Sequence, residues 1–177
     1  MGILITILLI IGGIIALFLV IALLTPRSIT LRKEILINRP KQDVFNYMKL
    51  LRNQEKYSVW VMKDPNIRLV YTGTDGTPGF ISSWESNDKN VGVGAQEIKK
   101  LAEGESMQVE IRFKKPFEGT NYALNMLTSV SNTQTKLTQE FSGTSKFPMN
   151  IMNLFMDKLV GKDMQQTLEN MKANLEK

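Results

Sequence analysis

The chain has 177 residues, and its 22 Lys and Arg outnumber its 17 Asp and Glu to give a net charge of +5. It contains no histidine and no cysteine, which excludes metal sites built on those ligands and Ser-His or Cys-His nucleophiles. The mild positive charge is spread out, unlike the basic stripes of nucleic-acid-binding proteins. No Gly-Lys-Ser/Thr phosphate-binding motif occurs, so neither nucleic acid nor a nucleotide is an expected partner.

The first 26 residues carry no charged side chain, and Ile3 to Leu24 form an almost unbroken apolar run. As a helix rising 1.5 Å per residue, this run reaches about 33 Å, enough for a hydrocarbon core of roughly 30 Å. A cleaved signal sequence has a basic start, a shorter apolar core and a small-x-small cleavage site, none of which is present. We therefore predict a retained transmembrane anchor over residues 1–26 and one domain over residues 27–177.

Three basic residues, Arg27, Arg32 and Lys33, follow this apolar run closely, whereas no basic side chain precedes it. Basic residues favour the cytoplasmic side of a membrane span. We therefore expect a single-pass membrane protein whose domain lies in the cytoplasm. The membrane is the expected partner, and the sequence names no protein partner.

The domain begins with a strand and a short helical region. Alternating side chains predict a strand over residues 30–38, which Arg39-Pro40 ends. Pro40 suits the first position of a helix, and Val44, Met48 and Leu51 then form one apolar stripe, which predicts a helix over residues 41–51. Residues 54–66 have no clear periodicity, and a second short helix ending near Asp64-Pro65 is the alternative to an irregular segment.

From residue 67 to residue 142 the pattern is one of strands separated by turns. The predicted strands cover residues 67–72, 80–86, 91–101, 105–114, 120–130 and 134–141. Because no helix interrupts them, we expect an antiparallel sheet. The chain then ends in a predicted long helix over residues 148–175, with a bend at Gly161.

One segment carries a family resemblance. Glu34 to Phe45 (EILINRPKQDVF) resembles the opening of SRPBCC-superfamily proteins of the polyketide cyclase/dehydrase type. Further residues fall where that family tends to place similar ones: Trp60, Asp64-Pro65, Gly79-Phe80, Trp84, Gly92-x-Gly94, Ile98 and Phe141.

The resemblance covers residues 30–177 and implies an α+β helix-grip (START-like) fold. In this fold an antiparallel sheet of about seven strands wraps around a long C-terminal helix, and here one transmembrane helix precedes it. The superfamily includes cyclases, lipid carriers and hormone receptors. The resemblance therefore implies the fold rather than one activity.

Apolar side chains on the strands and on the last helix are candidates to line a cavity between sheet and helix, since small-molecule pockets are mostly apolar. The candidate ligand-binding residues are Trp60, Phe80, Trp84, Val109, Ile111, Phe113, Tyr122, Leu124, Met126, Phe141, Met152, Phe155 and Met156. A packed core without a cavity is an equally good interpretation of the same residues.

Acid/base catalysis would need a carboxylate in such a pocket. The strand carboxylates are Glu85, Glu97, Glu110 and Glu140, and Glu110 alternates with Val109 and Ile111, so we expect it to face water. Arg112 is the candidate partner for an anionic ligand group, although a surface charge is the simpler interpretation. We therefore expect no catalytic residue, no cofactor and no metal.

Three functions remain open. The leading hypothesis is a membrane-anchored domain that binds a hydrophobic small molecule or lipid without catalysis. The alternative is a membrane-tethered protein-interaction module with a packed core. A cyclase or dehydratase acting on an apolar substrate is the third, and a buried ionisable side chain in the cavity would distinguish it.

Overall fold

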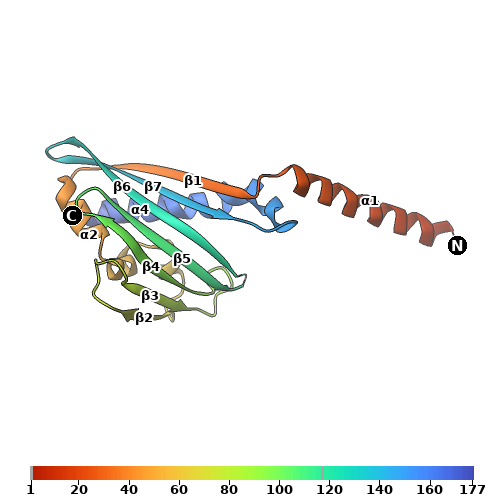
Figure 1. The fold of residues 1–177 in the computed structure, drawn as a ribbon, viewed down its shortest axis with the longest axis horizontal. Coiled ribbons are helices and arrows are strands. Elements are labelled where there is room, and N and C mark those ends of the chain that lie inside the picture. Colours follow the sequence, from red (N-terminus) through yellow and green to blue (C-terminus); the bar gives the residue numbers. More distant parts are fainter. Residues whose placement is uncertain (1, 117) are drawn as a thin grey trace.

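The computed structural model describes residues 2–116 and 118–177 as a curved sheet and a C-terminal helix, with one further helix projecting from the end of the domain (Figure 1). This projecting helix, α1, covers Gly2–Leu24. Met1, at the start of the predicted anchor, lies outside the described residues. Within the described residues α1 is the one helix long and apolar enough to cross a membrane.

The described residues form seven strands in one antiparallel sheet, in the order β1-β7-β6-β5-β4-β3-β2. The strands are β1 Ser28–Ile37, β2 Arg68–Thr72, β3 Ile81–Glu85, β4 Val93–Ala102, β5 Ser106–Lys115, β6 Gly119–Ser131 and β7 Gln134–Thr144. This confirms the predicted sheet. Register shifts in β4, between Val93 and Gly94 and between Ile98 and Lys100, mark bulges that help the sheet to bend.

Three short helices connect β1 to β2. They are α2 Lys41–Met48, the 3₁₀ helix η1 Leu51–Lys56 and α3 Val59–Lys63. The predicted stripe of Val44, Met48 and Leu51 is buried, as expected for a helix that packs on the sheet. The region without clear periodicity, residues 54–66, therefore contains the second half of η1 and the whole of α3, which places Ser58 and Trp60 beside the sheet.

The C-terminal segment differs from the single long helix predicted over residues 148–175. It consists of a 3₁₀ helix η2 Met149–Phe155, a π-helical turn η3 Asp157–Gly161 and the α-helix α4 Lys162–Leu175. Gly161 lies at the last join, as its position suggested. A Cβ there would meet the Asp157 carboxylate at 2.4 Å and Lys33 Cε at 3.1 Å, so glycine permits this close packing.

The hydrophobic core lies between the sheet, α2 and the C-terminal part of α4. Its centre contains Ile37, Phe45, Leu137 and Leu168, each fully buried. The N-terminal part of the C-terminal segment contributes no member to this core. The concave side of the sheet is therefore filled at one end only, and the other end leaves room for a cavity.

Candidate functional site

A cavity of about 240 Å³ lies between strands β2–β5 and β7, helix α3 and the π-helical turn η3. Ten of its fifteen lining residues are apolar. The lining consists of Gln54, Ser58, Trp60, Val61, Ile67, Leu69, Ser82, Trp84, Asn90, Val91, Gln96, Ile111, Phe113, Phe141 and Val160. The composition is that of a small-molecule pocket, with mostly apolar walls and few polar groups.

Two aromatic rings form the best-defined wall of the cavity. Trp84 on β3 and Phe113 on β5 meet edge to face, with ring centroids 5.7 Å apart, an arrangement that aromatic pairs favour. The Trp84 indole donates a hydrogen bond of 3.2 Å to the Val91 carbonyl, which fixes its orientation. The ring lies against Gly94, where a Cβ would come within 2.4 Å of the indole.

The glycines of the Gly92-x-Gly94 motif therefore have a structural explanation. Gly92 has a φ of +66°, and a Cβ there would come within 2.1 Å of the Lys115 carbonyl oxygen. Because a side chain fits at neither position without displacement, the motif allows β4 to pass close to β5 and to Trp84. The motif therefore helps to shape the cavity.

The polar side chains of the lining are amides and hydroxyls. Gln54 from η1 and Gln96 from β4 are joined by a hydrogen bond that Gln96 Nε2 donates to Gln54 Oε1, and Ser58 and Ser82 are buried. Among the residues that the structure describes, no ionisable side chain lines this cavity. These groups can orient a hydroxyl or carbonyl group of a ligand, but they offer no acid or base with a pKa near neutrality.

Three ionisable residues outside the lining, Tyr57, Tyr71 and Asp64, have shifted pKa values. Burial raises the pKa of the Tyr57 hydroxyl, so this residue stays neutral. Burial and the hydrogen bond to the Glu55 carboxylate likewise raise the pKa of Tyr71. Hydrogen bonds from Ser86 and the Asn66 amide hold the pKa of Asp64 below its usual value. None of these residues lines the cavity.

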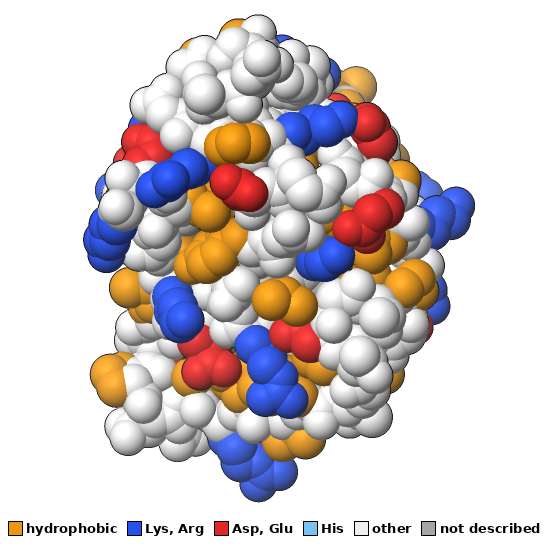
Figure 2. Space-filling model, turned by 90° about the vertical axis from the view of Figure 1, so that its left-hand side faces the viewer, with side chains coloured by type: hydrophobic (Ala, Val, Ile, Leu, Met, Phe, Trp, Pro, Cys, Tyr) orange, Lys and Arg blue, Asp and Glu red, His pale blue; other side chains and the backbone are white. Residues whose placement is uncertain are grey.

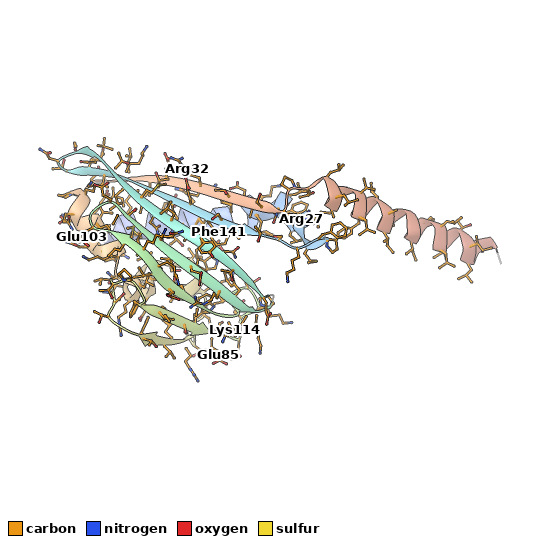
Figure 3. The ribbon with its side chains drawn as sticks, in the orientation of Figure 1. Arg27, Arg32, Glu85, Glu103, Lys114 and Phe141 are labelled. Atoms are coloured by element: carbon orange, nitrogen blue, oxygen red, sulfur yellow. The ribbon has the colours of Figure 1, made fainter. Side chains whose placement is uncertain are left out.

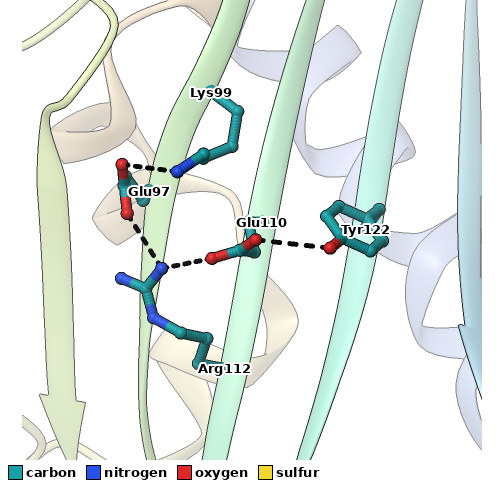
Figure 4. Close-up of polar contacts among 5 residues, drawn as sticks. All are labelled: Glu97, Lys99, Glu110, Arg112 and Tyr122. Atoms are coloured by element: carbon teal, nitrogen blue, oxygen red, sulfur yellow. Dashed lines mark hydrogen bonds and ion pairs between the residues drawn. The ribbon is translucent and has the colours of Figure 1, made fainter.

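Two of the four strand carboxylates, Glu97 and Glu110, form a cluster with Arg112 on the opposite, outer face of the sheet (Figure 4). Arg112 Nη1 donates to Glu97 Oε2 at 2.8 Å and also to Glu110, and Lys99 Nζ donates to Glu97 Oε1 at 3.0 Å. These partners hold the pKa of Glu97 below its usual value. As the alternation predicted, Glu110 and Arg112 do not enter the cavity.

The structure brings five of the thirteen predicted binding residues together in the cavity: Trp60, Trp84, Ile111, Phe113 and Phe141. Phe141 lies on β7, the strand next to the edge strand β1 (Figure 3). Phe80 and Val109 are instead core residues, 1% and 2% exposed. Phe80 stacks on Tyr71 at a centroid distance of 6.0 Å.

The remaining six predicted residues lie away from the cavity. Tyr122, Leu124 and Met126 alternate along β6 with the buried Ala123, Asn125 and Leu127, and therefore occupy the outer face. Met152, Phe155 and Met156 lie in or directly after η2, and the first two are exposed.

Sequence reasoning missed ten of the lining residues. Gln96 and Leu69 could have been found, because each alternates in phase with inward-facing residues of its strand. Gln54, Ser58 and Val61 belong to the region without periodicity, and Asn90 and Val91 to a loop, so no pattern marked them. The other three are Ile67, Ser82 and Val160.

The family model described as "Polyketide cyclase / dehydrase and lipid transport" matches residues 28–176 of the chain. Among curated proteins, none matches the sequence. The structural comparisons all concern proteins of low sequence identity and so bear on the fold alone.

Three solved structures illustrate the fold. The norcoclaurine synthase of Thalictrum flavum, solved with dopamine and hydroxybenzaldehyde, has a TM-score of 0.65 and 7% identity, covering 86% of this chain and 88% of its own. The Zhui aromatase/cyclase of a Streptomyces species has a TM-score of 0.64 and 8% identity, with coverages of 84% and 94%. A protein of Chromobacterium violaceum has a TM-score of 0.58 and 16% identity, with coverages of 84% and 97%.

Proposed function

The chain belongs to the polyketide cyclase/dehydrase and lipid transport family, and on that premise we propose that it is a membrane-anchored domain that binds a hydrophobic small molecule or lipid. The observation that carries this proposal is the cavity of about 240 Å³ with its aromatic and aliphatic walls. Ligand pockets commonly measure about 300–1,000 Å³. This one therefore suits a compact apolar ligand, or one end of a longer ligand that extends through the opening.

Binding without catalysis is favoured over an acid/base enzyme by the chemistry of the cavity walls. The family description and two of the solved structures named above concern enzymes or transport, so the fold permits either role. Proton transfer needs a positioned group of suitable pKa. The polar members of the lining are amides and hydroxyls, with Ser58 and Ser82 buried, and they serve better to orient a ligand than to move a proton.

The anchoring part of the proposal is supported by α1. Its 23 residues reach about 35 Å as a helix, and only 6% of its most apolar window is buried against the rest of the chain, whereas a soluble core helix would be covered. Arg27, Arg32 and Lys33 follow it. These residues support a cytoplasmic domain.

The test uses native mass spectrometry of the full chain released from detergent micelles, followed by lipid extraction. We expect an added mass of an apolar molecule that is lost in Phe113→Arg, because a charge would enter the apolar wall. The matched control is Val130→Arg, at a position that is 53% exposed on β6 and should retain the ligand. Far-UV circular dichroism checks that both variants are folded.

The two tryptophans of the chain both line the cavity, so their emission gives a second readout. A fatty acid or other apolar ligand that enters the cavity should change this emission in the wild type and in Val130→Arg but not in Phe113→Arg. A wild-type chain that carries no added mass and shows no change with a panel of fatty acids and aromatic compounds would refute ligand binding.

A further inference from the structure

The segment from Phe147 to Leu159, which we call the apolar segment, exposes large hydrophobic side chains to an unusual extent. Six of them are between 39% and 57% exposed: Phe147, Met149, Met152, Leu154, Phe155 and Leu159. They lie on a stretch of only thirteen residues. Such an exposed apolar patch commonly marks a surface that contacts a partner or a membrane.

Hydrogen bonds hold the apolar segment at the end of α1. The Asn150 amide donates to the Ala22 carbonyl at 2.6 Å and to the Thr25 carbonyl at 2.7 Å. The Asn153 amide donates to the Pro26 carbonyl at 2.9 Å. Asn150 is only 1% exposed, so its two bonds are shielded from water, whereas the Asn153 bond is exposed.

These bonds have a clear physical role. The last carbonyls of a helix have no partner within the helix, and the Asn150 amide supplies one to Ala22. Ala22 and Thr25 are buried, while the neighbouring Leu23 and Leu24 are 69% and 81% exposed. The exposed apolar end of α1 therefore lies next to the apolar segment.

The charges around the segment are mostly basic. Arg27, Lys146, Lys158 and Lys162 are all exposed, and Asp157 is paired with Lys33 at 2.8 Å. Apolar side chains flanked by Lys and Arg are the combination that binds the interface of a membrane containing anionic lipids.

The two ends of the domain differ. Arg27 marks the end beside α1, whereas Glu103 lies at the far end (Figure 3). Seen from the far end, the surface carries basic and acidic side chains interspersed with small hydrophobic areas (Figure 2). The β6–β7 hairpin, which contains Val130, projects at this end (Figure 1). A membrane-facing surface is therefore expected at one end alone.

We infer that the apolar segment lies in the interface of the same bilayer that α1 spans and gives the domain a second, fixed contact with lipid. The inference rests on the proposed anchoring by α1. Its consequence concerns the cavity, because Val160, the residue after the segment, is part of the cavity lining. The domain would then hold this wall of the cavity next to the membrane from which an apolar ligand is drawn.

The experiment uses the full chain reconstituted in vesicles of phosphatidylcholine and phosphatidylglycerol. Because the chain has no cysteine, a single Leu154→Cys carries one environment-sensitive fluorophore without any background. Matched labels go at Leu24→Cys on the anchor and at Val130→Cys on the far hairpin, where exposure (53%) is similar to that of Leu154 (57%). Lipids with nitroxides at defined chain depths then quench the labels that contact the bilayer.

We expect the Leu154 label to be quenched several-fold more than the Val130 label, with the shallow nitroxide more effective than the deep one. Quenching at Leu24 but not at Leu154 would overturn the inference and leave the anchor standing. A lack of quenching at both positions would overturn the anchoring together with the inference. The Leu154 label could also show emission typical of a water-free environment and yet not be quenched by the lipids. If unlabelled Leu154→Cys chains then cross-linked to one another, a second copy of the chain would cover the segment instead of lipid, and the inference would be overturned. The thermal midpoint of each labelled chain verifies that it is folded.

Discussion

The two parts of the C-terminal segment both carry large apolar side chains, but they lie against different neighbours. In α4, Met164, Leu168 and Met171 are at most 2% exposed and pack on the sheet. In η2, Met149 and Phe155 are about half exposed. Whether a hydrophobic residue is buried therefore depends on the surface opposite it. Helix α4 faces the sheet and α3, whereas η2 faces the end of α1 and, by our inference, lipid.

The backbone follows the same division. α4 is a regular α-helix whose apolar stripe matches the sheet, whereas the preceding residues form 3₁₀ and π turns. Polar contacts position this irregular part, through Asn150 at the end of α1 and through the Lys33–Asp157 ion pair at 2.8 Å. A helix held by side-chain hydrogen bonds need not keep one continuous apolar stripe.

The largest expected effect comes from truncating one apolar residue in each part. Leu168→Ala removes a fully buried side chain and should lower the free energy of unfolding by about 2–5 kcal/mol. Phe155→Ala removes an exposed side chain and should change it by less than about 0.5 kcal/mol. Urea unfolding of the full chain in mild detergent, followed by tryptophan emission, measures both. Equal losses of unfolding free energy in the two variants would contradict the distinction between a packed α4 and an exposed η2.

The sequence was sufficient to predict the order of the elements, because β-strand alternation and short turns are local signals. In β5, Met107, Val109, Ile111 and Phe113 all face inward as their alternation indicates. The apolar run of α1 and the stripe of Val44, Met48 and Leu51 are local signals as well. The single helix predicted over residues 148–175 was correct only for α4.

Strand β6 shows why the candidate site was only partly predictable. Its larger apolar residues, Tyr122, Leu124 and Met126, alternate with Asn121, Ala123 and Asn125. Hydrophobicity alone therefore predicts that the wrong set of side chains faces the concave side of the sheet. Asn125 is nonetheless buried, because Gln139 Nε2 donates a hydrogen bond of 2.9 Å to its side-chain oxygen. A partner on another strand compensates the burial of a polar group, and no pattern within β6 reveals that partner.

A substitution in the wall of the cavity should lower the free energy of unfolding by an intermediate amount. Gly94→Ala would bring a methyl group within 2.4 Å of the Trp84 ring and 2.6 Å of the Arg112 carbonyl oxygen. The ring can turn toward the cavity but the carbonyl cannot, so we expect a loss of about 1–3 kcal/mol of stability together with weaker ligand binding.

The matched control for this change is Gly119→Ala, because a Cβ at Gly119 meets nothing within 4 Å and the residue also lies on a strand. Urea unfolding gives the stability of both variants, and the tryptophan titration with fatty acids gives ligand binding. If Gly94→Ala bound ligand as the wild type does, Trp84 would not be a wall of the binding site.

The third substitution, Arg112→Gln, lies on the outer face of the sheet, away from both parts of the C-terminal segment, and should have only a small effect on stability. Arg112, through its hydrogen bond, and then Lys99 hold the pKa of Glu97 below the ordinary value of 4.5. A lowered pKa in the folded state means that this stabilisation is fully present above about pH 4.5 and is lost as the pH falls through the folded-state pKa. Because Arg112 is partly exposed, its loss in Arg112→Gln should cost no more than about 1 kcal/mol.

The measurement for this last prediction is an NMR titration of the Glu97 carboxyl carbon, combined with urea midpoints between pH 3 and pH 7. In Arg112→Gln the pKa of Glu97 should rise toward its ordinary value, and the loss of stability on acidification should become smaller. Arg68→Gln is the control, since Arg68 and Glu85 are well exposed and 3.9 Å apart, and it should leave Glu97 unchanged. A large loss of ligand binding in Arg112→Gln would contradict the proposal that the ligand binds in the cavity, because this cluster lies on the outer face of the sheet (Figure 4).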